Sequence, residues 1–158
     1  MKLLFHQRFF SWLGSYDVYD ESDEVVYVIK GSISWTRTLD VFTPDGNHVG
    51  TVERKAFTFL PTYDLYQNGV HYATLRKDIS FFSHRFSFID GVNWKIDGDF
   101  LGWDYTLSDG LGTTIATISK EIWNWTDTYV IDVPNAEHAL MALMAVITID
   151  IEKERNNN

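Results

Sequence analysis

The sequence contains no cysteine, only three prolines, and fewer basic than acidic residues: 13 Lys and Arg against 22 Asp and Glu, for a net charge of −9. Without cysteine the chain forms no disulfide bond and offers no thiol nucleophile. The scarcity of proline predicts that few strands are interrupted. The acidic excess argues against a nucleic-acid-binding protein, because such proteins contact phosphates through a basic surface.

Long hydrophobic runs are also missing from most of the chain. The apolar start, Met1 to Phe5, is interrupted by His6, Gln7 and Arg8 before it reaches the length of a signal peptide. The apolar segment 139–149 spans roughly 16 Å as a helix, whereas a bilayer core is ~30 Å thick. We therefore expect no transmembrane segment, and a cytoplasmic protein that associates with a membrane only at its surface.

What the sequence does contain is a high content of hydrophobic (45%) and aromatic (16%) residues in a chain of 158 residues. This length and composition predict a single folded domain over residues 1–158. Between about residues 3 and 133, apolar and polar residues alternate with period two, as in Val92, Trp94 and Ile96, which predicts short strands. Four dipeptides are typical of hairpin turns: Asp45-Gly46, Asn68-Gly69, Asp97-Gly98 and Asp109-Gly110.

One segment near the carboxyl end has a different pattern. Asn135 is a candidate N-cap, and residues about 135–151 read as a helix. From Ala139 to Ile149 the only polar residue is Thr148, so every side of this helix is apolar and it must be enclosed. About twelve strands precede it, and a closed sheet larger than ~8 strands has room inside. The sequence thus predicts a mainly β fold, an antiparallel β-barrel of about twelve strands around a central α-helix, with the polar tail 152–158 in solvent.

Sequence landmarks occur in a characteristic order along the chain: Phe9-Phe10-Ser11-Trp12, Val25 to Gly31, Leu60-Pro61-Thr62-Tyr63, Trp94 to Phe100, Ile118-Ser119-Lys120, Tyr129 to Val133, and the apolar helix. In this order the chain resembles the LURP-one-related family of the Tubby-like C-terminal-domain superfamily. The resemblance implies a twelve-stranded antiparallel barrel around a C-terminal helix. The superfamily includes phosphoinositide-binding Tubby domains and phospholipid scramblases, although their functional residues do not align residue by residue with this chain.

Basic residues occupy corresponding positions in two similar hairpin sequences, 45–55 and 68–77. Arg54-Lys55 and Arg76-Lys77 end these hairpins, and Arg37 is expected nearby, so all five could meet on one rim of the barrel. Clustered basic side chains would bind a phosphorylated headgroup through charge-assisted hydrogen bonds. The competing interpretation is that they are solvated strand ends that prevent sheet edges from pairing.

These observations favour a non-catalytic binding module for a phospholipid headgroup, a membrane surface or a protein partner. The alternative hypothesis is an enzyme that acts on a small molecule through carboxylates in a surface cleft, with Asp97, Asp99 and Asp104 as candidates. The sequence has no nucleophile motif and no phosphate-binding loop. His48 and His71 hold equivalent positions after turn glycines but are too few for a zinc site, so no metal or cofactor is predicted.

Overall fold

The computed structural model describes residues 1–6, 14–33, 37–79, 85–99, 101–123 and 126–157. The strands in these residues are β1 (Lys2–Phe5), β2 (Gly14–Tyr19), β3 (Val25–Ile33), β4 (Arg37–Phe42), β5 (His48–Arg54), β6 (Thr62–Gln67), β7 (Val70–Asp78), β8 (Arg85–Asp90), β9 (Lys95–Asp99), β10 (Asp104–Ser108), β11 (Thr114–Trp123) and β12 (Thr126–Asp132). A short 3-10 turn, η1 (Ala136–His138), leads into the helix α1 (Ala139–Asn157).

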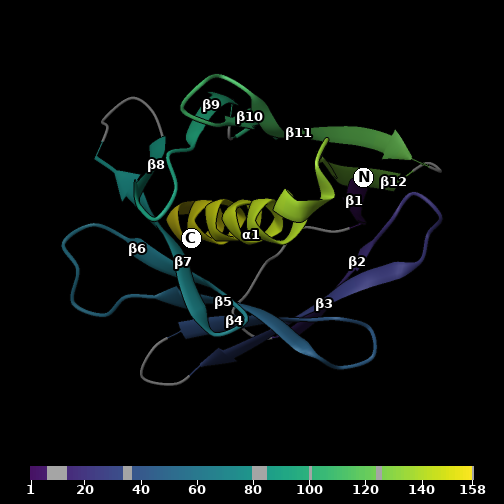
Figure 1. Ribbon diagram of the computed structural model, residues 1–158, viewed down its shortest axis with the longest axis horizontal. Helices are drawn as coiled ribbons and strands as arrows, with labels where there is room; N and C mark the ends of the chain where they lie inside the picture. The colour runs from purple at the N-terminus through teal and green to yellow at the C-terminus, as the bar shows by residue number, and fades with distance from the viewer. Residues whose placement is uncertain (7–13, 34–36, 80–84, 100, 124–125, 158) are drawn as a thin grey trace.

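The strands form one 12-stranded antiparallel sheet in the order β8-β7-β6-β5-β4-β3-β2-β1-β12-β11-β10-β9. The sheet curls into a nearly closed barrel (Figure 1). Most neighbours are consecutive hairpin strands, but β1 pairs with β12, with Leu3 opposite Ile131. This pairing joins the beginning of the chain to the last strand, so β8 and β9 remain as the two edges of the sheet.

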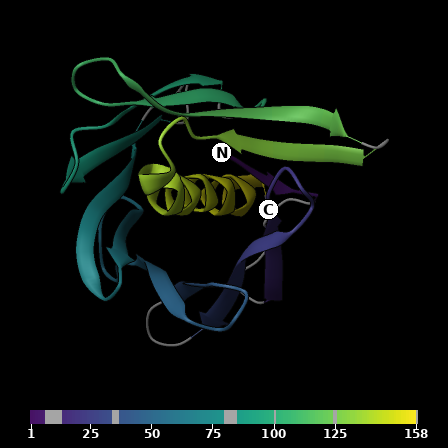
Figure 2. The ribbon, with the colours of Figure 1, turned by 45° about the vertical axis from the view of Figure 1, so that its right-hand side comes forward.

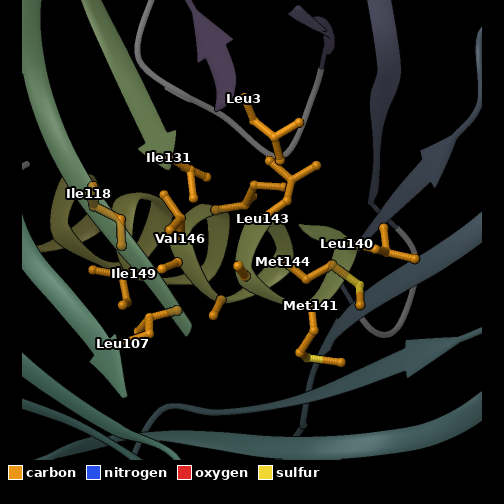
Figure 3. Close-up of a cluster of buried hydrophobic side chains, with 14 of the residues drawn as sticks. Leu3, Leu107, Ile118, Ile131, Leu140, Met141, Leu143, Met144, Val146 and Ile149 are labelled. Atoms are coloured by element: carbon orange, nitrogen blue, oxygen red, sulfur yellow. The ribbon is translucent and has the colours of Figure 1, made fainter. Parts of the chain in front are cut away.

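Helix α1 runs through the interior of this barrel (Figures 1 and 2). Every residue from Ala139 to Ile151 is buried. Leu143 and Val146 lie on the side of Leu3 and Ile131, while Ile149 lies near Ile118 and Leu107 (Figure 3). The apolar circumference of the helix is therefore covered by sheet residues, which confirms the predicted enclosure.

Two features position the beginning of the helix. Asn135 acts as the cap of η1, because its Oδ1 accepts a hydrogen bond from the Glu137 amide at 3.1 Å. Near the beginning of the helix, Gly50 of β5 makes room for Met144, whose sulfur would lie 2.9 Å from a Cβ at that glycine. Among the residues that the structure describes, no helix is both long enough and apolar enough to cross a bilayer.

The carboxyl end of the helix differs from the sequence prediction. The helix continues to Asn157 instead of ending near residue 151. Glu152 is 3% exposed and Lys153 6% exposed, so the beginning of the polar tail 152–158 lies inside the barrel and not in solvent. Polar side chains are stable there only if they are paired. Lys153 Nζ donates a hydrogen bond of 3.5 Å to the Leu101 carbonyl and lies 5.4 Å from the centroid of the Trp103 ring.

One predicted turn was also wrong. Asp45-Gly46, Asn68-Gly69 and Asp109-Gly110 lie between strands, as expected, but Asp97-Gly98 lies within β9. Gly98 is paired with Tyr105 of β10, and a Cβ on Gly98 would lie 2.4 Å from the Asp104 carbonyl oxygen. This glycine is needed for close approach of two strands and not for a reverse turn.

Candidate functional site

The five basic residues singled out from the sequence lie at one end of the barrel. We call this end the carboxyl rim, because α1 ends there; it includes the start of β4, the end of β5, the start of β6 and the end of β7. The opposite end, where α1 begins, is the amino rim. Strand geometry divides the five residues: Arg37, Arg54 and Lys77 share the register of core residues, whereas Lys55 and Arg76 belong to the outer face.

Of the three inward residues Arg37, Arg54 and Lys77, Lys77 contacts the buried carboxylate of Glu152. The Tyr63 hydroxyl donates a hydrogen bond to Glu152 Oε2. Lys77 Nζ lies 3.9 Å from Oε1, and Arg155 Nη1 lies 3.6 Å from Oε2. These contacts explain why the polar end of the helix is buried: one carboxylate from α1 is paired with cations from α1 and β7 and with a phenol from β6.

Burial and the carboxylate of Glu152 both raise the pKa of Tyr63, and the charges of Arg54 and Arg155 offset only part of this increase. Its pKa is raised well above the usual range, first by burial and then by the charge and hydrogen bond of Glu152. The neutral phenol is thus the form that the site stabilises. Arg54, opposite Tyr63 in the β5–β6 pairing, has a buried Nε with no hydrogen-bond partner among the residues that the structure describes.

The outer group lines a separate groove of about 490 Å³ on the outer face of β5 to β8. Its lining combines the two cations with threonine and apolar side chains: Lys55, Thr58, Phe59, Leu60, Thr62, Thr74, Arg76, Ile89 and Asp90. Lys55 Nζ lies 3.5 Å from Asp64 Oδ2, and Arg76 Nη2 lies 3.2 Å from Asp78 Oδ1. We call this depression the outer groove.

A loop with two exposed aromatic residues borders the outer groove. Phe57 is 100% exposed and Phe59 92% exposed, in the segment between β5 and β6. Two backbone hydrogen bonds of 2.9 Å fix its base, from the Lys55 amide to the Thr62 carbonyl and from the Lys77 amide to the Pro61 carbonyl. Phe57 has a φ of +58°, which is unfavourable for a bulky residue. The loop is thus held in a defined conformation that presents both rings to solvent.

Phe57 and Phe59 were not among the residues predicted from the sequence to form a site. A signal was present, since two Phe within three residues follow the end of a hairpin and precede Leu60-Pro61, where no continuing strand can bury them.

The repeated hairpins carry a second shared feature on the outer face. In one, His48 Nε2 lies 2.9 Å from both Asp40 Oδ1 and Thr51 Oγ1. In the other, His71 Nε2 lies 2.9 Å from Thr74 Oγ1 and 3.4 Å from Asp64 Oδ1. In a catalytic relay a histidine contacts the nucleophile with one ring nitrogen and a carboxylate with the other. Here each histidine makes both contacts with Nε2, so the arrangement connects the two strands of a hairpin and is not a relay. Over the described residues, no three His, Asp or Glu side chains are grouped to hold a metal ion.

The three carboxylates of the enzyme hypothesis lie close together on β9 and β10, but they do not line a common groove among those described. All three are exposed, and Asp99 and Asp104 face each other across β9 and β10. Asp97 lines a different groove, between β8 and β9, that neither of the others borders. Asp99 Oδ1 accepts a hydrogen bond from the Leu101 amide at 3.0 Å, so it serves a local turn.

Comparison with known proteins identifies the relatives of this chain. The model of the LURP-one-related family matches residues 1–150. The uncharacterised protein YxjI of Bacillus subtilis is 26% identical over 152 residues, which cover 96% of this chain and 93% of that protein. The X-ray structure of a protein from Arabidopsis thaliana is similar with a TM-score of 0.66 over 96% of this chain and 90% of that one, at 13% identity. The fold is therefore shared at low sequence identity, and this chain belongs to the LURP-one-related family.

Proposed function

We propose that this protein is a non-catalytic module that binds the surface of an anionic phospholipid membrane through the carboxyl rim. The observation that carries the proposal is the juxtaposition of Phe57 and Phe59 with the outer groove that contains Lys55 and Arg76. Membrane-surface proteins combine the same two elements, aromatic side chains at the headgroup level and nearby cations for lipid phosphates.

The exposed rings provide the apolar part of this interaction. A fully exposed Phe side chain gains about 1.5–3 kcal/mol when it is removed from water. The loop holds Phe57 and Phe59 outward at a cost in backbone strain, and Phe59 shares the groove lining with Leu60 and Ile89. Together these residues form an apolar edge beside the cations, which an interfacial lipid layer would cover.

The cations provide the selectivity for anionic lipid. Each basic residue near such a surface contributes about 1 kcal/mol, and the contribution decreases with salt. Lys55 and Arg76 are each paired with an aspartate, and the net charge of the chain is −9, so a lipid phosphate must compete with carboxylates. Two cations and two rings together supply at most ~8 kcal/mol, which corresponds to micromolar affinity at best. We expect reversible binding.

Liposome co-sedimentation tests this function directly. We expect the protein to sediment with phosphatidylcholine vesicles that also contain phosphatidylserine or a phosphoinositide, more at low than at high salt. The paired substitution Phe57→Ser and Phe59→Ser should weaken binding at least about 10-fold, because most of the apolar contribution is lost. Lys55→Glu with Arg76→Glu should remove the difference between anionic and neutral vesicles.

Two matched control variants distinguish binding through the proposed surface from non-specific association with vesicles. Leu111 is 94% exposed in the turn between β10 and β11 at the amino rim, so Leu111→Ser should leave binding unchanged. Lys30→Glu removes an exposed charge from β3, distant from the outer groove in the sheet order. Absence of sedimentation with every vesicle at low salt, or equal losses in the controls, would refute the proposal.

A further inference from the structure

The edges of the sheet, β8 and β9, border a second groove. They are the two ends of the strand order, and no strand pairing joins them within the described residues. A groove of about 530 Å³ lies between them. Its lining includes a run of consecutive residues from each edge, Arg85 to Phe88 of β8 and Lys95 to Gly98 of β9, together with Asp78, Asn93 and Trp94. We call this groove the seam.

The seam lies in the plane of the sheet and not on one of its faces. Phe86 and Phe88 of β8 pack on the core, while Arg85 and Ser87 alternate with them. On β9, Ile96 packs on the core, while Lys95 and Asp97 are exposed. Because side chains of both faces line the groove, the backbones of both edges border it too. A site of this form suits an extended chain, whose backbone can pair with the edge and whose side chains alternate between the faces.

The turn between the two edges packs closely against β7 and the core. Gly91 has a φ of +87°, and a Cβ there would lie 2.0 Å from the Tyr72 carbonyl oxygen, which shows how closely the turn crosses β7. The Trp94 ring packs edge-on against Phe88, with centroids 5.7 Å apart, and against His138, at 5.5 Å. These contacts connect the seam to the core and to the start of the helix.

The charges on the outer side of the seam indicate the chemistry of the occupant. Asp78 is already satisfied, since Arg76 Nη2 lies 3.2 Å from Oδ1 and the Ser87 hydroxyl donates to Oδ2. Arg85 and Lys95 form no ion pair with any described residue, and Asp97 is the one carboxylate of the lining without such a pair. Two cations therefore face the outside of the seam against one carboxylate, above an apolar inner side of Phe86, Phe88, Trp94 and Ile96.

From this geometry we propose that the seam binds an extended segment of a partner protein as an added β-strand. The segment has apolar residues at alternate positions, directed inward onto Phe86, Phe88 and Trp94, and acidic residues between them, directed outward to Arg85 and Lys95. The runs of lining residues correspond to roughly four residues of strand, about 13 Å. This surface is distinct from the outer groove, and its occupant is a peptide and not a lipid.

A synthetic peptide tests the proposal. The probe is the acetylated, amidated heptapeptide Glu-Val-Glu-Val-Glu-Val-Glu, titrated against the full chain while backbone amide resonances are followed by NMR. We expect shifts confined to β8, β9 and their turn, and slower hydrogen exchange of edge amides in the complex. A peptide with proline in place of the glutamate at its third position should not bind, because proline has no amide hydrogen to donate to a strand edge.

Charge exchange provides the second arm. Arg85→Glu with Lys95→Glu should lower the affinity for the glutamate peptide at least about 10-fold. The same variant should bind a peptide of the same length with lysine in place of glutamate more tightly than it binds the glutamate peptide. Lys30→Glu, an exposed substitution on β3, should change neither affinity. Any of three results overturns the proposal: no shifts in β8 and β9 up to about 1 mM peptide, equal binding of both peptides to the unmodified chain, or concentration-dependent shifts of the seam without peptide, which would assign it to a second copy of this chain.

Discussion

Replacing Val146 with aspartate should lower the free energy of unfolding by more than about 4 kcal/mol, because a carboxylate would be buried without a partner. Val146 is 0% exposed in the middle of the helix, on the side of Leu3 and Ile131 (Figure 3). Domains of this kind have total stabilities of about 5–15 kcal/mol, so a large fraction of the chain should be unfolded. Urea titration followed by tryptophan fluorescence and far-ultraviolet circular dichroism measures the loss.

The matched control places the same substitution on the outside. Val70 is 69% exposed at the start of β7, so Val70→Asp should change stability by less than about 1 kcal/mol. If Val146→Asp were tolerated as well as Val70→Asp, one side of the helix would have to face solvent, and the architecture described above would be wrong.

The second large effect concerns Glu152. Glu152→Ala should cost about 2–3 kcal/mol, because it removes the acceptor of the Tyr63 hydrogen bond and the counter-charge of Lys77 and Arg155, which solvent reaches in part. Tyr63→Phe should cost less, about 1–2 kcal/mol, since Glu152 keeps both cations. Urea unfolding of the two single variants and the double variant measures the coupling energy between residues 63 and 152.

The order of these effects is diagnostic. A Glu152→Ala variant as stable as the unmodified chain would mean that the polar end of the helix is solvated, as the sequence pattern suggested. Equal losses for Tyr63→Phe and Glu152→Ala would assign the stabilisation to the hydrogen bond alone and not to the charges around it.

The barrel could be predicted from the sequence because its strongest signal is local. Residues 139–149 are apolar on every side of a helix, and only enclosure by other elements explains such a pattern. The extent of the helix could not be predicted in the same way. Glu152 and Lys153 read as a solvated tail because their burial depends on partners from distant strands, such as Tyr63, which no local pattern reveals.

The sequence predicted that the basic residues lie at one rim, but not that they separate into inward and outward side chains. The repeated hairpins correctly indicated that Arg54, Lys55, Arg76 and Lys77 reach one rim. Consecutive residues of a strand point to opposite faces, so each Arg-Lys pair must separate into one inner and one outer side chain. Arg54 and Lys77 therefore belong to the buried end of the helix. Only Lys55 and Arg76 line the outer groove.

The two proposed binding surfaces are neighbours that can be tested independently. The outer groove uses Ile89 and Asp90 at the end of β8, and the seam uses residues 85–88 of the same strand. Asp78 connects them, because it borders the seam and is paired with Arg76 of the outer groove. The substitutions chosen above avoid Asp78, but Arg76→Glu removes its ion pair. Phe57→Ser with Phe59→Ser and Arg85→Glu with Lys95→Glu are therefore the variants that report separately on lipid binding and on peptide binding.

Native-state hydrogen exchange of helix α1 tests the central claim most directly. If the sheet encloses the helix, the amides of residues 140–151 exchange only when the whole barrel unfolds. Their free energies of opening should then equal the free energy of global unfolding. They should also decrease with urea concentration with the same m value as global unfolding. Opening energies well below the global value, independent of urea, would show that the helix separates from an intact sheet and would contradict the enclosed architecture.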